Sequence, residues 1–162
     1  MGEVIKVGMA DLKVCQYPDS LTTLGLGSCV GVALYDSRTK VTGLAHIMLP
    51  DSTAIKNNSN IAKFADTGIV ETVRLMEKLG ASKSRLVAKI AGGANMFHFA
   101  NETNKALRVG DNNVAAVKKK LGEMGIPIIA EDTGCNYGRT VVINSEDGMF
   151  TIKSVGKPLK VI

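Results

Sequence analysis

Short runs of apolar residues, many rich in valine and isoleucine, recur along most of the chain and are separated by polar turns. Runs of this length and composition are typical of β-strands. Polar segments such as 36–40 and 145–148 separate successive runs and predict hairpin turns. We therefore expect about eight strands, at 4–10, 12–17, 29–35, 41–46, 85–91, 126–133, 139–144 and 149–155.

Two stretches instead repeat their apolar residues at helical spacing, which predicts two long helices. In the first, the apolar positions are Ile61, Ala65, Ile69, Val73 and Met76, and Gly80 ends the pattern. In the second they are Val114, Val117, Leu121 and Met124, with Asp111 as the expected N-cap. Because strands cluster early and late rather than alternating with helices, the pattern predicts an α+β fold.

Length and composition limit the possible classes of protein. A chain of 162 residues that is 45% hydrophobic is long enough for one sizeable core, so we expect a single domain over residues 1–162. No apolar stretch reaches membrane-spanning length, and the first residues lack a secretory pattern. Three cysteines without C-x-x-C spacing fit reduced thiols. These features predict a soluble, cytoplasmic protein that does not insert into membranes.

Charge and glycine patterns argue against nucleic acids and nucleotides as ligands. The formal charge is +5, but aromatic residues make up only 4% of the chain and tryptophan is absent, so few side chains could stack on bases. Neither the glycine-rich stretch at 25–30 nor the diglycine at 92–93 completes a phosphate-binding or dinucleotide motif. The cysteines and histidines also lack the spacing of metal ligands. We therefore expect no cofactor and no metal.

The candidate chemistry lies in one hairpin. Cys29 stands near the start of its first strand and His46 near the end of its second, so antiparallel pairing would bring thiol and imidazole together. An imidazole beside a thiol can accept its proton and generate the nucleophilic thiolate. The alternative is that Cys29 is a small buried hydrophobic residue. Gly25 and Gly27 favour the first interpretation, because they allow a carbonyl group to approach main-chain N–H groups closely.

The other cysteines and the second histidine carry weaker signals. Cys15 has no histidine near it in sequence, and we interpret it as structural. Cys135 follows a glycine in a predicted turn, where its thiol is expected to be exposed. His98 stands between two phenylalanines without a nearby carboxylate, which favours a solvated or core histidine over a catalytic base.

Four motifs in this order resemble those of the CheD family, the chemoreceptor glutamine deamidases of bacterial and archaeal chemotaxis: T-L-G-L-G-S-C-V, A-H-I-M-L-P-D-S, K-I-A-G-G-A-N-M-F and A-E-D-T-G. The resemblance runs over nearly the whole chain. It implies a variant papain-like cysteine hydrolase with a β-sandwich flanked by helices, similar to the catalytic domain of cytotoxic necrotizing factor toxins. By motif position it places the nucleophile at Cys29, the histidine at His46 and a threonine that orients it at Thr23.

The resemblance implies that a cysteine thioester forms on particular receptor glutamines, which become glutamates as ammonia leaves. We expect the backbone N–H groups of Gly27, Ser28 and Cys29 to stabilise the oxyanion. The expected substrates are chemoreceptor cytoplasmic helices, whose acidic surfaces would attract a mildly basic enzyme. The alternatives are a transglutaminase, a receptor glutamyl methylesterase, and a docking regulator of a CheC-type phosphatase whose chemistry is secondary.

Overall fold

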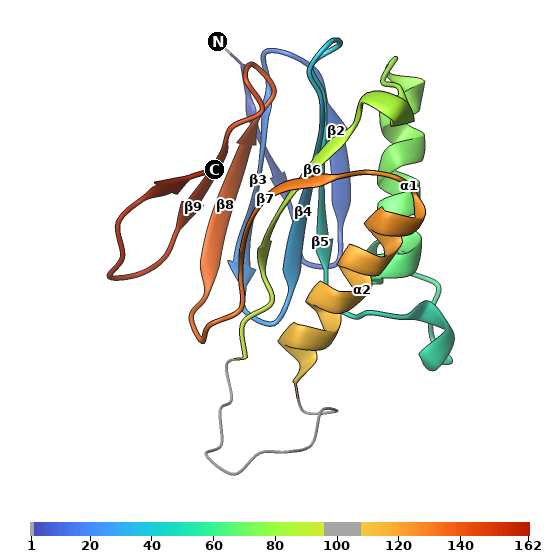
Figure 1. Cartoon of the computed structure of the whole chain (residues 1–162), viewed down its shortest axis with the longest axis vertical. Helices are drawn as coiled ribbons and strands as arrows, with labels where there is room; N and C mark the ends of the chain where they lie inside the picture. The colour runs from blue at the N-terminus through green and yellow to red at the C-terminus, as the bar shows by residue number, and fades with distance from the viewer. Residues whose placement is uncertain (1, 96–107) are drawn as a thin grey trace.

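The computed structural model describes residues 2–95 and 108–162, which form two five-stranded β-sheets packed face to face (Figure 1). The first sheet has the strand order β1-β3-β8-β9-β10. Its strands are Val4–Val7 (β1), Ser20–Leu26 (β3), Arg139–Asn144 (β8), Phe150–Lys153 (β9) and Lys160–Val161 (β10). The second sheet has the order β2-β5-β4-β6-β7. Its strands are Leu12–Cys15 (β2), Val30–Asp36 (β4), Val41–Ile47 (β5), Val87–Gly92 (β6) and Ile128–Thr133 (β7).

The second sheet is buried on both faces, as the continuous apolar runs of β4 and β5 require. Successive side chains of a strand point to opposite faces. On β4, Val30, Val32 and Leu34 pack in the core beneath the helices, whereas Ala33 packs between the two sheets. The core between the sheets also contains Cys29, so this cysteine faces the first sheet.

Both long helices, α1 (Ala65–Lys78) and α2 (Val109–Glu123), cover the outer face of the second sheet (Figure 1). The predicted α+β class with two sheets and two helices is confirmed. The two helices lie on the same side, so the molecule has three layers: first sheet, second sheet and helices.

The structure corrects both predicted helix starts. Residues Ile61–Lys63 form a 3-10 turn, and α1 begins only at Ala65 because the backbone around Phe64 is extended and pairs with Leu49. Asp111 does not cap the second helix. It lies in the first turn of α2, whose N-cap is Arg108, and forms an ion pair with that residue at 3.3 Å.

The described residues form ten strands instead of the expected eight. The additional strands are β3, which was not among the expected strands, and the two-residue β10, which pairs with β9. The strand β3 matters for the site, because it carries Thr23 in the sheet that faces Cys29.

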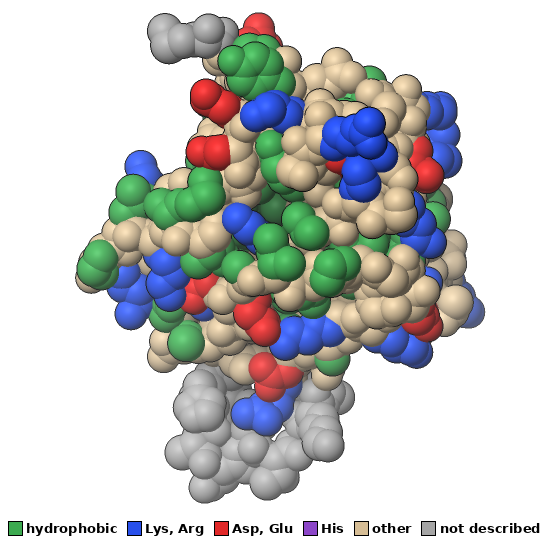
Figure 2. Space-filling view, turned by 45° about the horizontal axis from the view of Figure 1, so that its top comes forward, with side chains coloured by type: hydrophobic (Ala, Val, Ile, Leu, Met, Phe, Trp, Pro, Cys, Tyr) green, Lys and Arg blue, Asp and Glu red, His purple; other side chains and the backbone are tan. Residues whose placement is uncertain are grey.

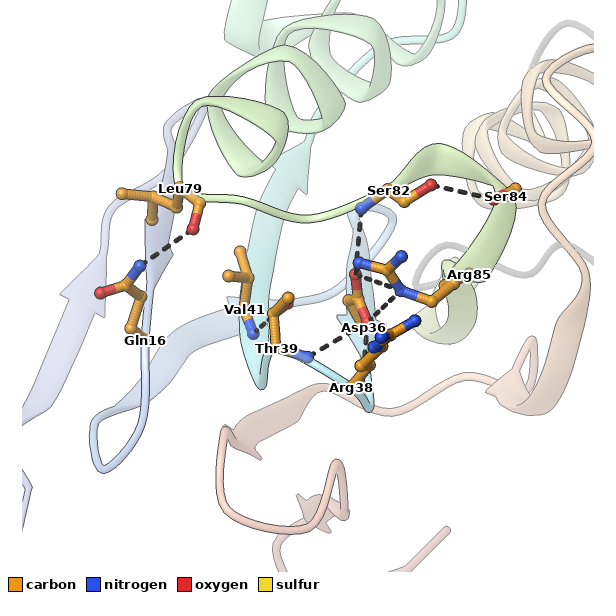
Figure 3. A network of polar contacts seen from close by, with 9 residues as sticks. All are labelled: Gln16, Asp36, Arg38, Thr39, Val41, Leu79, Ser82, Ser84 and Arg85. Atoms are coloured by element: carbon orange, nitrogen blue, oxygen red, sulfur yellow. Dashed lines mark hydrogen bonds and ion pairs between the residues drawn. The ribbon is translucent and has the colours of Figure 1, made fainter.

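A buried ion pair holds the turn end of the β4–β5 hairpin (Figure 3). Asp36 is fully buried, and its carboxylate accepts hydrogen bonds from Arg85 Nη2 at 2.8 Å and from the Ser82 N–H at 3.0 Å. Burial alone would raise the pKa of Asp36, but these bonds and those from the turn N–H groups outweigh it and hold the pKa below its ordinary range. One end of the hairpin is thereby fixed, and the candidate site lies at the other.

Candidate active site

The register of the β4–β5 hairpin places Cys29 and His46 on the same face of the second sheet. Gly31 pairs directly with His46, and Cys29 precedes Gly31 by two residues. Cys29 and His46 are therefore diagonal neighbours, as the hairpin predicts. Gly31 contributes no side chain between them, and the space beside it is already tight, because a Cβ there would lie 3.0 Å from a methyl group of Leu26.

Thr23 reaches His46 from the opposite sheet. Its Oγ1 lies 2.6 Å from His46 Nδ1 and 2.8 Å from the carbonyl oxygen of Val7, and both side chains are fully buried. A hydroxyl group has a single proton, which Thr23 donates to the Val7 carbonyl oxygen. The contact with His46 therefore requires the imidazole Nδ1–H to donate to the threonine oxygen.

This assignment leaves the lone pair of the neutral imidazole on Nε2. His46 Nε2 is buried and has no hydrogen-bond partner within the described residues. Buried polar atoms are normally paired, so an unpaired one calls for an explanation. An unpaired basic nitrogen on the face that carries Cys29 has the properties of a general base, because it can accept the proton of a nucleophile.

The two candidate groups are both neutral at rest. Burial raises the pKa of the Cys29 thiol, and its own backbone N–H offsets only part of this effect. Burial also lowers the pKa of His46. Because these directions disfavour a thiolate–imidazolium pair, the thiol is expected to lose its proton to His46 during attack rather than before substrate arrives.

The turn at residues 27–29, just before β4, is held in place by hydrogen bonds to its carbonyl oxygens. Three consecutive carbonyl oxygens accept hydrogen bonds from the segments packed against the turn: Gly27 from the Ala94 N–H at 2.8 Å, Ser28 from Asn113 Nδ2 at 2.9 Å, and Cys29 from the Gly93 N–H at 2.8 Å. A peptide group is planar and almost always trans, so a fixed C=O also fixes the N–H that points the other way. The turn therefore has a defined set of N–H directions.

The N–H groups of this turn differ in availability. Gly27 N–H donates to the Gly25 carbonyl oxygen at 3.0 Å. The N–H groups of Ser28 and Cys29 have no acceptor on any other residue among residues 2–95 and 108–162. Of the three donors that the sequence suggested for an oxyanion, these two are the ones that remain open.

The diglycine Gly92-Gly93 packs directly against this turn. Both residues have positive φ angles, +106° and +66°. A Cβ on Gly92 would lie 2.3 Å from the carbonyl oxygen of Cys29, and one on Gly93 would lie 2.2 Å from a methyl group of Val114. Only glycine allows this approach. The segment that contacts the turn can be followed as far as Asn95, whereas Met96, Phe97 and His98 lie outside the described residues.

The other two cysteines lie as their sequence contexts suggested. Cys15 is buried in the core between the sheets, and its burial and the nearby Asp19 raise its pKa to about 11. Cys135 is exposed. Neither thiol forms a disulfide, so both are useful references for the reactivity of Cys29.

Comparison with known proteins assigns the chain to a family. Residues 48–154 match the family model described as CheD chemotactic sensory transduction. A protein of Lachnoclostridium phytofermentans named probable chemoreceptor glutamine deamidase CheD is 65% identical over 162 residues, which cover 100% of both chains. Proteins of the same name from Clostridium novyi and Moorella thermoacetica are 54% and 52% identical over 158 residues, 98% of this chain and 97% and 95% of theirs. The chain belongs to the CheD family.

The CheD model begins at residue 48, after all three candidate side chains. Thr23, Cys29 and His46 are instead covered by the full-length similarity to CheD relatives. Among solved structures, a Neisseria meningitidis protein of the DUF152 family has a TM-score of 0.53 and 12% identity, over 82% of this chain and 64% of that one. At this identity the similarity supports the fold alone. In the described part of the chain, no helix combines the length and apolar character needed to cross a membrane.

Sequence reasoning missed two contacts of the candidate site. The carbonyl oxygen of Val7, which fixes the proton of Thr23, comes from the parallel pairing of β1 with β3. Asn113 of α2 reaches the Cys29 turn from 85 residues away in sequence. No local pattern signals either contact, because each depends on how distant elements pack.

Proposed function

We propose that this protein is a protein-glutamine deamidase that converts specific glutamines of chemoreceptors to glutamate through a thioester on Cys29. The observation that carries the proposal is the Thr23–His46 contact, which leaves an unpaired basic nitrogen on the face of Cys29. Membership of the CheD family supports the choice of substrate, because its relatives are named chemoreceptor glutamine deamidases.

In the first step, His46 Nε2 takes the proton of the Cys29 thiol as the sulfur attacks the carbonyl carbon of the glutamine side chain. The carbonyl oxygen gains negative charge, and the open N–H groups of Ser28 and Cys29 are the candidate donors to it. The imidazolium then protonates the amide nitrogen. Ammonia leaves, and a thioester joins Cys29 to the receptor side chain.

In the second step, neutral His46 takes a proton from a water molecule, which attacks the thioester carbon. The carbon–sulfur bond breaks, and the imidazolium returns the proton to the Cys29 sulfur. The products are a glutamate side chain and the regenerated enzyme. Throughout both steps Thr23 accepts from Nδ1–H, so Nε2 remains the nitrogen that exchanges protons.

The proposed substrates are the cytoplasmic helices of chemoreceptors, which places the protein in the cytoplasm. The chain has a formal charge of +5, and Lys and Arg side chains are spread over the face seen in Figure 2 rather than gathered in one patch. A distributed positive field would attract acidic helices without fixing one orientation. The family resemblance also predicts a CheC-type phosphatase as a second partner.

The proposal is tested with purified enzyme and a receptor cytoplasmic fragment. We expect release of ammonia and a mass gain of about one dalton at each modified glutamine, because an amide NH₂ is replaced by OH. The same fragment carrying glutamyl methyl esters tests for methanol, and an added primary amine tests for transglutamination. The proposal would be contradicted if the enzyme released methanol or modified the added amine but, with water alone, gave neither ammonia nor the mass gain of about one dalton.

Substitution of Thr23 tests its role as the partner of Nδ1. Thr23→Val keeps the volume but removes the acceptor at 2.6 Å, and we expect the rate of ammonia release to fall about ten- to a hundredfold. Thr23→Ser keeps the hydroxyl group and is expected to stay within about threefold of wild type. A loss in Thr23→Val as large as that in Cys29→Ala would contradict this division of roles, because threonine carries no charge with which to stabilise the imidazolium.

A further inference from the structure

Asn113 of α2 connects the Cys29 turn to the strand that carries His46. Its Nδ2 lies 2.9 Å from the carbonyl oxygen of Ser28 and 2.9 Å from that of Met48, which follows His46 by two residues. Both partners are acceptors, so the NH₂ group of the amide must face them and donates both of its protons. Asn113 is fully buried.

The bond to Ser28 determines the direction of one particular N–H group. The Ser28 carbonyl and the Cys29 N–H belong to the same planar peptide group and point in opposite directions. With the carbonyl held by α2, the Cys29 N–H points away from the helix. A carbonyl that accepts a hydrogen bond also polarises its peptide group, which makes the N–H at the other end a stronger donor.

That N–H lies beside the reacting atoms. The backbone N–H of Cys29 acts on its own thiol and lowers the thiol pKa against the effect of burial. It is also one of the two N–H groups of the turn that have no acceptor on another residue in the described ranges. Its direction therefore affects both the nucleophile and the candidate oxyanion site.

The remaining atom of the side chain argues against a purely stabilising role. Asn113 Oδ1 is buried, and the described residues offer it no hydrogen-bond partner. A buried, unpaired carbonyl oxygen is unfavourable for folding. An asparagine at this position thus donates two hydrogen bonds but leaves its own Oδ1 without a partner.

We infer that Asn113 is a positioning residue, which aims the Cys29 N–H and holds the nucleophile turn against the strand end beyond His46. This inference rests on the proposed function. Asn113 touches neither the thiol nor the imidazole, so it acts through the Ser28–Cys29 peptide group and the Met48 carbonyl.

The experiment compares Asn113→Ala and Asn113→Ser with the control Val117→Ala. Val117 lies one turn further along α2, is fully buried and packs in the core beneath the helices, so its truncation reports a general loss of helix packing. Asn113→Ser fills part of the space, but its hydroxyl has only one proton and can donate to only one of the two carbonyl groups. Thermal unfolding of each variant establishes that it is folded at the assay temperature.

Two readouts separate positioning from packing. For receptor deamidation we expect kcat to fall about tenfold or more in the Asn113 variants with KM within about twofold, because the lost interaction acts mainly in the transition state. For alkylation of Cys29 by iodoacetamide, followed by mass spectrometry, we expect the pH midpoint to rise in the Asn113 variants. Val117→Ala should keep kcat within about twofold of wild type and leave the alkylation midpoint unchanged. The exposed thiol of Cys135 in each chain is the internal reference for alkylation.

The inference is wrong if a folded Asn113 variant keeps the wild-type kcat and alkylation midpoint, or if Val117→Ala reproduces both changes. Failure of the proposed function gives a different result, since wild-type enzyme would then release no ammonia. In that case the pH midpoint of Cys29 alkylation still tests whether Asn113 positions the turn, because alkylation requires no receptor.

Discussion

Replacement of Cys29 by alanine is expected to lower ammonia release from a receptor fragment on the order of a thousandfold or more, because no thioester can form without the nucleophile. Two control variants isolate that role. Cys15→Ala removes a buried thiol from the same core between the sheets, and Cys135→Ala removes an exposed one. Both controls should retain ammonia release within about threefold.

The comparison between Cys15 and Cys29 is informative because the two thiols are alike in burial, at 5% and 8% exposed. What differs is their surroundings. Cys29 lies diagonal to His46 and in a turn with open N–H groups, whereas Cys15 lies on β2, one of the two edge strands of the second sheet. If Cys15→Ala lost as much activity as Cys29→Ala, the effect would come from the core and not from the chemistry.

A second outcome would show that the chemistry is secondary to the binding of a partner. If Cys29→Ala releases no ammonia in vitro but fully supports chemotaxis, the protein acts by docking on a partner. Swimming assays of cells that carry Cys29→Ala in place of wild type therefore accompany the biochemical measurement. We expect these cells to show the defect of a strain that lacks the protein.

Sequence reasoning predicted the local part of the site. The β4–β5 hairpin spans few residues, and its apolar strands and polar turn determine the register that places Gly31 opposite His46. Cys29 and His46 could therefore be paired from spacing alone. The glycines at 92 and 93 belong to the K-I-A-G-G-A-N-M-F motif of the family resemblance, but the sequence does not show the contact with Cys29 that requires Gly92.

The part that sequence reasoning could not supply depends on packing between distant elements. Thr23 was placed only through the family resemblance, because its strand pairs with β8, more than a hundred residues later, and meets His46 across two sheets. The start of α1 was misplaced for a related reason. Apolar spacing begins at Ile61, but pairing of Phe64 with Leu49 keeps that backbone extended.

Gly92→Ala is expected to disrupt both stability and activity, and Gly80→Ala provides a matched control. The two glycines have nearly the same φ angle, +106° and +103°. Around Gly80 an added Cβ would meet nothing within 4 Å, whereas at Gly92 it would lie 2.3 Å from the Cys29 carbonyl oxygen. The pair therefore separates backbone strain from a clash with the nucleophile turn.

Strain alone should lower the free energy of unfolding of Gly80→Ala by about 1–2 kcal/mol and leave ammonia release nearly unchanged. In Gly92→Ala the backbone of Cys29 must also move, so we expect a loss of about 3 kcal/mol or more and a fall in kcat of about a hundredfold or more. Denaturant unfolding and ammonia release, measured below the unfolding transition of each variant, give the two quantities. Equal losses of kcat in the two variants would show that the contact between Gly92 and Cys29 does not position the thiol.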